Sequence, residues 1–169
     1  MKRLGLAFLL LTAVPVFAAT ANDLVAEGRA ALAARDVVKA MTAFNAAVEL
    51  DPANADAEYE RGRLLARIGE PKAAIIDFTA AIVARPGFGR AYAERGAAKY
   101  SIDSKEEAFA DFGNAILQSP TDHEVYVVRA THWLKLGKPD YARLDLEKAA
   151  SLADAKTAAS LRSFAAKLK

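Results

Sequence analysis

The amino-acid sequence predicts an all-α protein, a solenoid of stacked helical repeats, because the chain repeats itself every 34 residues. Pro52, Pro86 and Pro120 are spaced by this period, and the same small residues recur in the same order around each of them. Self-similarity with a period of about 20–50 residues is typical of repeat architectures. Taking each proline as position 32 divides the chain into four units, 21–54, 55–88, 89–122 and 123–156.

Four further positions of the unit accept only one kind of side chain. Positions 20 and 27 hold alanine in every unit, position 8 holds glycine or alanine, and position 24 holds phenylalanine or leucine. Position 20 is Ala40, Ala74, Ala108 and Ala142, and position 27 is Ala47, Ala81, Ala115 and Ala149. Position 8 is Gly28, Gly62, Gly96 and Ala130, and position 24 is Phe44, Phe78, Phe112 and Leu146. Small residues allow two helices to pack closely, and the large residue fills the space beside them.

Each unit is therefore predicted to be two antiparallel helices. In the second unit they should span 55–68 and 71–84, because Gly69 favours a helix end and Pro71 a helix start. The fourth unit carries the same glycine and proline at the same positions. The proline at position 32 has no backbone donor, so it ends the second helix and turns the chain.

Capping residues predict the other helix starts. Asn22 or Asp23 is expected to cap the first helix of the first unit. Ser104 and Thr121, each followed three residues later by glutamate, have the spacing of capping boxes. These boxes would start the second helix of the third unit and the first helix of the fourth.

The repeat ends at Asp154, which stands where a fourth proline would be. A capping helix is predicted in the segment 155–169, over about 155–168, because apolar residues there recur at helical spacing on one face. These residues are Leu161, Phe164, Ala165 and Leu168. Such a helix would cover the last apolar surface of the stack.

The pattern of small residues, large residue and proline resembles the tetratricopeptide repeat (TPR), and the resemblance covers about 21–156. It implies a right-handed α-solenoid of four helix-turn-helix TPR units plus a C-terminal capping helix. It also implies a concave inner surface, lined by the first helix of each unit, that binds a segment of another protein.

Charged residues recur at two positions of the unit. Arg61, Arg95 and Arg129 occupy position 7, and Asp77, Asp111 and Asp145 occupy position 23. The first unit lacks both, so arginine and aspartate are present or absent together. We interpret them as structural ion pairs within each unit; the alternative is a ladder of arginines for an acidic ligand.

By the resemblance, positions 2, 5, 6, 9, 12 and 13 of each first helix line the inner surface. The predicted partner-binding groove consists of Arg29, Tyr59, Glu60, Arg63, Arg67, Arg90, Glu94 and Tyr100. Its four arginines would form a basic cluster with two glutamates among them, and arginine and tyrosine are enriched at binding hot spots. The alternative is a solvated face whose charges neutralise one another. The lysines and asparagines of the carboxylate-clamp TPR domains are absent, so their ligand is not implied.

No motif for catalysis, a metal or a cofactor stands out. His123 and His132 are nine residues apart, so they would lie on roughly opposite sides of a helix. There is no glycine-rich phosphate loop and no zinc-protease motif. Trp133 falls where the repeat keeps a large packing residue. The sequence therefore predicts a protein that is not an enzyme, with no cofactor and no metal.

The first residues predict export. Lys2 and Arg3 precede an apolar run from Leu4 to Phe17, and small residues follow. This is the pattern of a signal peptide over 1–21, with cleavage after Ala18 or Ala21. A retained membrane anchor is the alternative, but about 14 apolar residues fall short of the roughly 20 that a span needs.

Removing this segment leaves 21 basic and 21 acidic residues from the 23 and 21 of the full chain. A neutral mature chain gives no argument for a nucleic-acid partner. The chain has no cysteine, which excludes disulfides and lipid attachment at a cleavage site. We expect an exported protein with no stable membrane insertion after cleavage, periplasmic if the host is Gram-negative.

The predicted function is a non-catalytic protein–protein interaction scaffold or adaptor of the cell envelope, binding a peptide or protein segment in the concave groove. The alternative is a carbohydrate- or peptidoglycan-binding envelope protein. That function usually needs a row of aromatic platforms, and the groove offers only Tyr59 and Tyr100. Homo-oligomerisation through a solenoid end or the convex face stays open.

Overall fold

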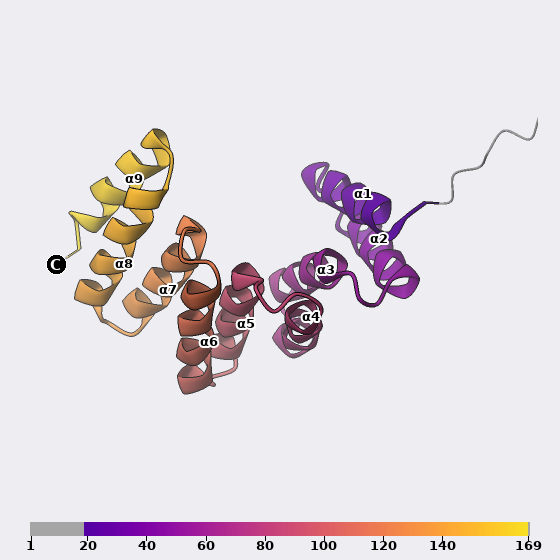
Figure 1. Cartoon of the computed structure of the whole chain (residues 1–169), viewed down its shortest axis with the longest axis horizontal. Helices are drawn as coiled ribbons and strands as arrows, with labels where there is room; N and C mark the ends of the chain where they lie inside the picture. The colour runs from indigo at the N-terminus through magenta and orange to yellow at the C-terminus, as the bar shows by residue number, and fades with distance from the viewer. Residues whose placement is uncertain (1–18, 169) are drawn as a thin grey trace, which may run out of the picture.

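The computed structural model describes residues 19–168, and these residues form nine helices (Figure 1). The helices are α1 (Ala21–Ala33), α2 (Val37–Leu50), α3 (Ala55–Arg67), α4 (Pro71–Ala84), α5 (Gly89–Ser101), α6 (Lys105–Gln118), α7 (His123–Lys135), α8 (Pro139–Leu152) and α9 (Ala155–Ala165). Of the predicted signal peptide, residues 1–18 lie outside the described part of the chain.

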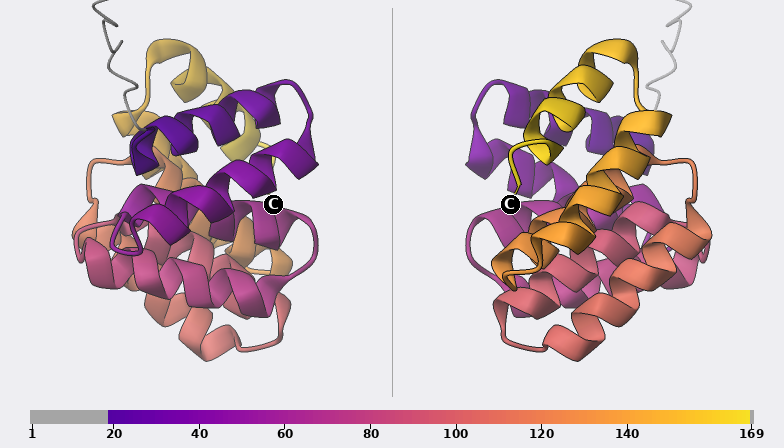
Figure 2. Two further views of the ribbon diagram at one scale, coloured as in Figure 1. Left: turned by 90° about the vertical axis from the view of Figure 1, so that its right-hand side faces the viewer. Right: turned by 90° about the vertical axis from the view of Figure 1, so that its left-hand side faces the viewer.

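The helices pack as four pairs followed by a final helix, which confirms the predicted fold class. Each odd-numbered helix packs on the helix that follows it, and α9 packs on α8. The pairs follow one another along the long axis in an arc whose two ends rise on the same side (Figure 1). Views along that axis show the pairs layered one behind the other (Figure 2). Along the arc α1, α3, α5 and α7 contact one another in sequence, so they line a common surface.

The core of each of the first three pairs is an aromatic ring packed against a glycine, and Leu146 and Ala130 occupy the same positions in the fourth pair. Phe44, Phe78 and Phe112 are completely buried. A β-carbon placed on Gly28 would overlap the ring of Phe44, and one placed on Gly96 would lie 2.7 Å from the ring of Phe112. The repeated glycine is therefore required by the ring that packs directly on its backbone.

The turn between the two helices of each pair contains one residue with a positive φ angle, which is glycine in two pairs and another residue in the other two. Gly69 and Gly137 adopt positive φ angles of 89° and 67° between the helices of the second and fourth pairs. Arg35 and Asp103 adopt 62° and 68° in the first and third pairs, where no glycine is available. The left-handed conformation suits glycine best, so these two residues carry strain that the packed helices hold in place.

Three capping predictions were wrong. Thr20, rather than Asn22 or Asp23, caps α1: its hydroxyl accepts the N–H of Asp23 at 3.2 Å, and the Asp23 carboxylate accepts the N–H of Thr20 at 2.8 Å. Asp122, rather than its neighbour Thr121, caps α7 by accepting the N–H of Glu124 at 3.0 Å.

The third concerns Ser104. Helix α6 begins directly after it, as predicted, but its side chain makes no capping hydrogen bond, so only the predicted capping box was wrong. The backbone N–H of Ser104 instead donates to the carbonyl of Lys99 at 3.0 Å, across the turn that Asp103 forms. Two helix ends also differ from the prediction. Helix α3 ends at Arg67 and α9 ends at Ala165, although Leu168 still packs against the last core cluster. No helix in the described range 19–168 combines the length and apolar character needed to cross a membrane.

Two glycine substitutions should have opposite effects on the free energy of unfolding. Gly96→Ala should destabilise the protein by about 1–3 kcal/mol, since its methyl group would overlap Phe112 and lie 2.9 Å from a backbone oxygen. Gly113→Ala, in the exposed interior of α6 with no atom within 4 Å, should stabilise it by about 0.5–1 kcal/mol. Urea denaturation followed by circular dichroism measures both; a destabilised Gly113 variant would contradict the packing described here.

Candidate functional site

Three of the four helix pairs contain a partly buried arginine–aspartate ion pair. Each guanidinium donates two hydrogen bonds to one carboxylate: Arg61 to Asp77 at 2.7 and 2.8 Å, Arg95 to Asp111 at 2.9 and 2.7 Å, and Arg129 to Asp145 at 2.8 and 2.7 Å. The three aspartates are buried. Two parallel hydrogen bonds make this geometry strong and directional, so these charges act within the scaffold.

The three ion pairs have different neighbours, which sequence reasoning missed. Glu58 is a second buried acid beside Arg61, at 3.2 Å, and burial raises the pKa of its carboxyl. Lys99 is a second cation beside Asp111, at 3.0 Å. The recurrence at positions 7 and 23 concealed them, because neither residue repeats in the other units.

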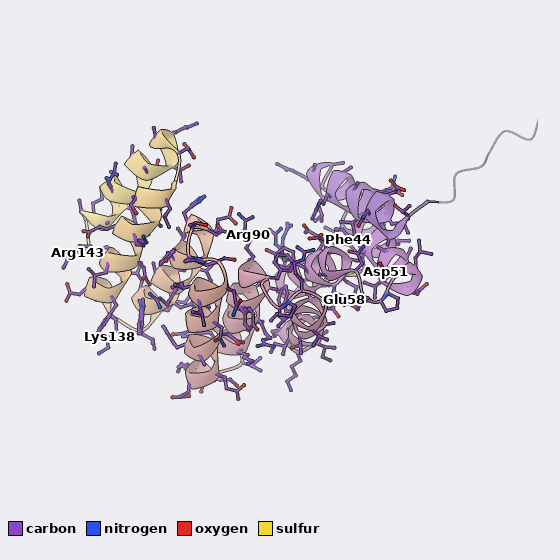
Figure 3. All side chains as sticks on the ribbon, viewed as in Figure 1. Phe44, Asp51, Glu58, Arg90, Lys138 and Arg143 are labelled. Carbon is purple, nitrogen blue, oxygen red and sulfur yellow. The ribbon has the colours of Figure 1, made fainter. Side chains whose placement is uncertain are left out.

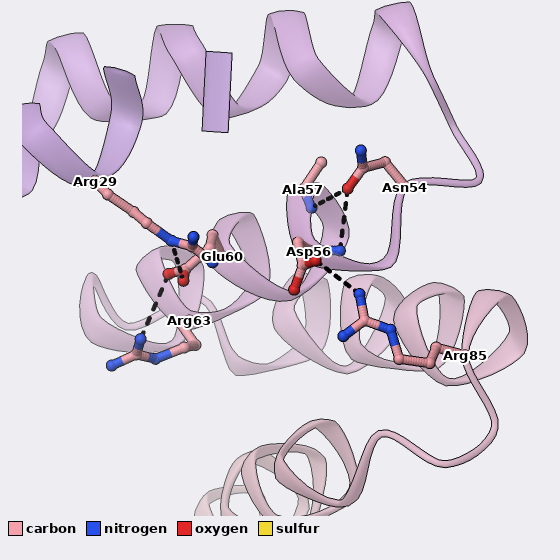
Figure 4. A network of polar contacts seen from close by, with 7 residues as sticks. All are labelled: Arg29, Asn54, Asp56, Ala57, Glu60, Arg63 and Arg85. Atoms are coloured by element: carbon pink, nitrogen blue, oxygen red, sulfur yellow. Dashed lines mark hydrogen bonds and ion pairs between the residues drawn. The ribbon is translucent and has the colours of Figure 1, made fainter. Parts of the chain in front are cut away.

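Glu60 lies at the centre of the predicted groove and is buried. The Nε of Arg29 donates to its Oε1 at 2.8 Å, and an Nη atom of Arg63 donates to its Oε2 at 3.4 Å (Figure 4). Close by, Arg85 donates to Asp56 at 2.7 Å. One carboxylate thus ties α1 to α3 and accepts two of the arginines of the predicted basic cluster.

Arg90 is also paired. Its guanidinium donates to the carboxylate of Asp122 and lies 3.1 Å from that of Glu124, which links α5 to the start of α7. These hydrogen bonds raise the pKa of Arg90 and lower that of Asp122. Figure 3 places Arg90 on the concave side of the stack and Lys138 on the opposite side.

The predicted basic cluster is therefore largely neutralised. Arg29, Arg63 and Arg90 all have acidic partners, whereas Arg67 is exposed and makes no ion pair with another residue of 19–168. Arg67 also lies outside the hollows described below. The sequence placed these arginines on one face, but it did not show that the acids of the adjacent helix would bind them.

The two groove tyrosines are mainly packing residues. Tyr59 is buried, and its ring lies 4.7 Å from that of Phe88 and 6.0 Å from that of Phe78, centroid to centroid. Burial raises the pKa of its hydroxyl. Tyr100 is partly buried, with its ring 4.8 Å from that of His132. Neither ring is an exposed platform.

His132, one of the two histidines of α7, is buried. Nδ1 of His132 lies 2.8 Å from the carbonyl oxygen of Val128, to which it must donate. Burial lowers the pKa of this ring, so it is neutral at pH 7. Trp133 is partly buried and packs on Phe109 and Tyr141. No group of three or more possible metal ligands occurs among residues 19–168.

Two hollows open on the surface that the odd-numbered helices share. The alanine hollow, of about 420 Å³, lies between α3, α5 and α7, and its lining includes Ala66, Ala97, Ala98, Ser101, His132 and Lys135. The arginine hollow, of about 410 Å³, is lined mainly by charged side chains, among them Arg29, Glu60, Arg63 and Arg90. Glu94 lines both hollows and therefore joins them.

Solved structures show what this architecture is. A thermophilic TPR protein from Thermus thermophilus superimposes with a TM-score of 0.76 at 18% sequence identity, covering 86% of this chain and 81% of that one. The chain has a TPR fold. At this level of identity the likeness concerns the fold alone. No protein-family model matches the sequence, and no curated protein matches it either.

Two further solved structures with a similar fold are complexes with a protein or a peptide. One chain of the Cut9–Hcn1 hetero-tetramer matches with a TM-score of 0.71 and 17% identity over 87% of this chain, which spans only 30% of that one. The second TPR domain of Spaghetti (RPAP3), solved with an HSP90 peptide, matches with a TM-score of 0.57 and 24% identity, covering 59% of this chain and 92% of that one.

Removing the arginine of each TPR ion pair should cost different amounts of stability. Arg61→Leu should be the most destabilising, because it leaves two buried carboxylates, Asp77 and Glu58, without their cation. Arg129→Leu should follow, with a loss of about 3 kcal/mol, since one buried aspartate loses its partner. Arg95→Leu should cost least, because Lys99 remains beside Asp111. Urea denaturation at pH 7 gives the order, and equal losses in all three variants would show that these neighbours have no effect.

Proposed function

We propose that this chain is a non-catalytic interaction scaffold that binds a peptide or protein segment across its concave surface. The observation that carries the proposal is the pair of adjoining hollows along α3, α5 and α7, joined at Glu94. Together they form an elongated depression that crosses several units, which suits an extended segment better than a compact small molecule. Apart from Glu94, the charged groups of the arginine hollow are held in ion pairs rather than arranged as an acid, a base and a nucleophile.

Peptide binding also agrees with what related folds do. The Spaghetti TPR domain was solved with an HSP90 peptide, and the similar chain of the Cut9–Hcn1 hetero-tetramer was solved within that complex. The alternative, binding of carbohydrate or peptidoglycan, receives less support, because both groove tyrosines are packed against other rings. Stacking on a sugar needs an exposed aromatic face.

We further propose that the scaffold is exported and acts in the cell envelope. The support is the N-terminal sequence, with its two basic residues, apolar run and small residues. In a Gram-negative host this would place the mature protein in the periplasm. The partner would then be another envelope protein.

A photoreactive residue introduced at Ala97 should crosslink to the partner in living cells. Ala97 lines the alanine hollow, so a bound segment would lie within reach of its side chain. The matched control is the same residue at Val83, which is 76% exposed on α4 and lines none of the described hollows. Mass spectrometry of the crosslinked products identifies the partner.

The concave surface would be the wrong assignment if position 83 gave the same products as position 97, or if only position 83 gave products. Circular dichroism of both variants excludes unfolding as the cause. A product found only with the residue at position 97 supports the proposal.

Export should be accompanied by cleavage after Ala18 rather than after Ala21. Cleavage after Ala21 would remove Thr20, and α1 would lose its capping box, at a cost of about 1 kcal/mol. The intact mass of the protein purified from the exported fraction distinguishes the two products, which differ by residues 19–21. A mature chain that begins at Asn22 would contradict the expectation.

A further inference from the structure

Glu94 of the third unit can be compared with the equivalent residue of the second unit, Glu60. Glu60 and Glu94 occupy the same position, position 6, in the second and third units. Both lie on the concave surface, on α3 and α5. Because the two units have the same helix pairing, the surroundings of one glutamate indicate what is missing around the other.

Glu60 binds two arginines, and both come from position 9 of a unit. Arg29, from the preceding unit, reaches across from α1, and Arg63, from the same helix, reaches back by three residues. Figure 4 shows both guanidinium groups directed at this one carboxylate.

The residues at position 9 around Glu94 are Arg63 and Ala97. Arg63 donates to Glu60, and Ala97 carries no charge. Glu94 accordingly forms no ion pair with any residue in the described range 19–168. It is a partly buried acid without the cation that its equivalent has.

Open space replaces that cation. Glu94, Ala97 and Ala98 of α5 line the alanine hollow together with Ala66 of α3. In the second unit an arginine side chain extends from position 9 beside the glutamate. In the third unit a methyl group stands at that position, and the hollow of about 420 Å³ opens there.

The charges that face Glu94 leave it uncompensated. Burial raises the pKa of its carboxyl, Glu124 of α7 and Glu60 of α3 raise it further, and Arg63 of α3 opposes them. Lys135 lines the same hollow from α7. It occupies position 13 of its unit whereas Glu94 occupies position 6, and seven positions correspond to about 10 Å along a helix. His132 is neutral for the reason given above, and Arg90 is held by Asp122.

We propose that Glu94 is the anchor for a lysine or arginine side chain of the bound segment, whose cationic group takes the place that Arg63 has beside Glu60. This inference rests on the proposed function, since it names the chemistry of the segment that the concave surface binds. The ligand is thus a basic peptide segment. The basic groove predicted from the sequence would instead have selected an acidic one.

Peptide libraries that each have one fixed residue at the centre test the proposal. Ten-residue libraries carrying lysine, glutamine or glutamate at the centre are displayed on phage and selected against the purified protein at pH 7. The wild type should enrich the lysine library over the glutamine library by about tenfold, the size expected for one charge-assisted hydrogen bond. Glu94→Gln should remove the preference, and Glu94→Lys should transfer it to the glutamate library. Glu106→Gln, a substitution of an exposed acid on α6, should leave it unchanged.

A second variant supplies the missing cation from within the chain. Ala97→Arg should place a guanidinium beside Glu94, as Arg63 is placed beside Glu60. It should lower the pKa of Glu94, measured by NMR of the side-chain carboxyl, because an opposite charge favours the ionised form. It should also weaken binding of the selected lysine peptides while the protein stays folded.

The pH dependence gives a further readout. Binding needs the ionised carboxylate, so the affinity of the wild type for a lysine peptide should fall as the pH is lowered through the raised pKa of Glu94. The same peptide should show a flatter profile with Glu94→Gln. An unchanged profile would contradict a role for this carboxylate.

Failure of the anchor and failure of the proposed function give different results. Suppose that the selected peptides crosslink at position 97, but the wild type does not prefer the lysine library or Glu94→Lys still prefers it. This result would overturn the role of Glu94 as an anchor and would leave the scaffold function standing. Enrichment of no peptide at all, or of peptides that crosslink only at position 83, overturns the proposed function and the anchor with it.

Discussion

The contact between a glycine backbone and an aromatic ring is the constraint on which the rest of the structure depends. Each ring at position 24 occupies the space that a side chain at position 8 would need. This brings the two helices of a pair close together and fixes their rotation about their own axes. Once that rotation is set, positions 6 and 9 of the odd-numbered helices face the concave side, and positions 7 and 23 meet inside the pair.

The sequence was sufficient to predict the fold, because the period of 34 residues records the packing of each pair directly. It was less informative at the helix ends. Thr121 and Asp122 are adjacent and both suit a cap, and the choice depends on where the chain enters α7. Thr20 was missed because it lies just before the first unit, where the repeat gives no guidance.

The candidate site could be predicted only in part. The period placed Arg29, Glu60 and Glu94 on the same face, but it gave no distances between neighbouring units. Those distances decide that Glu60 has two arginines and Glu94 has none. Two ion pairs of the concave surface cross from one unit to the next: Arg29 to Glu60 and Arg90 to Glu124. Two further hydrogen bonds join a first helix to the residue that caps the first helix of the next unit: Arg90 donates to Asp122, and Asn54 donates to Asn22 at 2.9 Å. The same side chains thus hold adjacent units together and shape the surface offered to a partner.

The pairing of the glutamate at position 6 with arginines at position 9 also has a consequence for how such a chain changes during evolution. Repeat arrays gain and lose whole units by recombination between similar segments of a gene. Loss of the second unit, residues 55–88, would place Arg29 of the first unit next to Glu94 of the third, in the relation that Arg29 now has to Glu60. The carboxylate would then be satisfied within the chain. A single event that leaves the fold intact could in this way abolish a charged docking point, and the reverse event could create one without any point mutation.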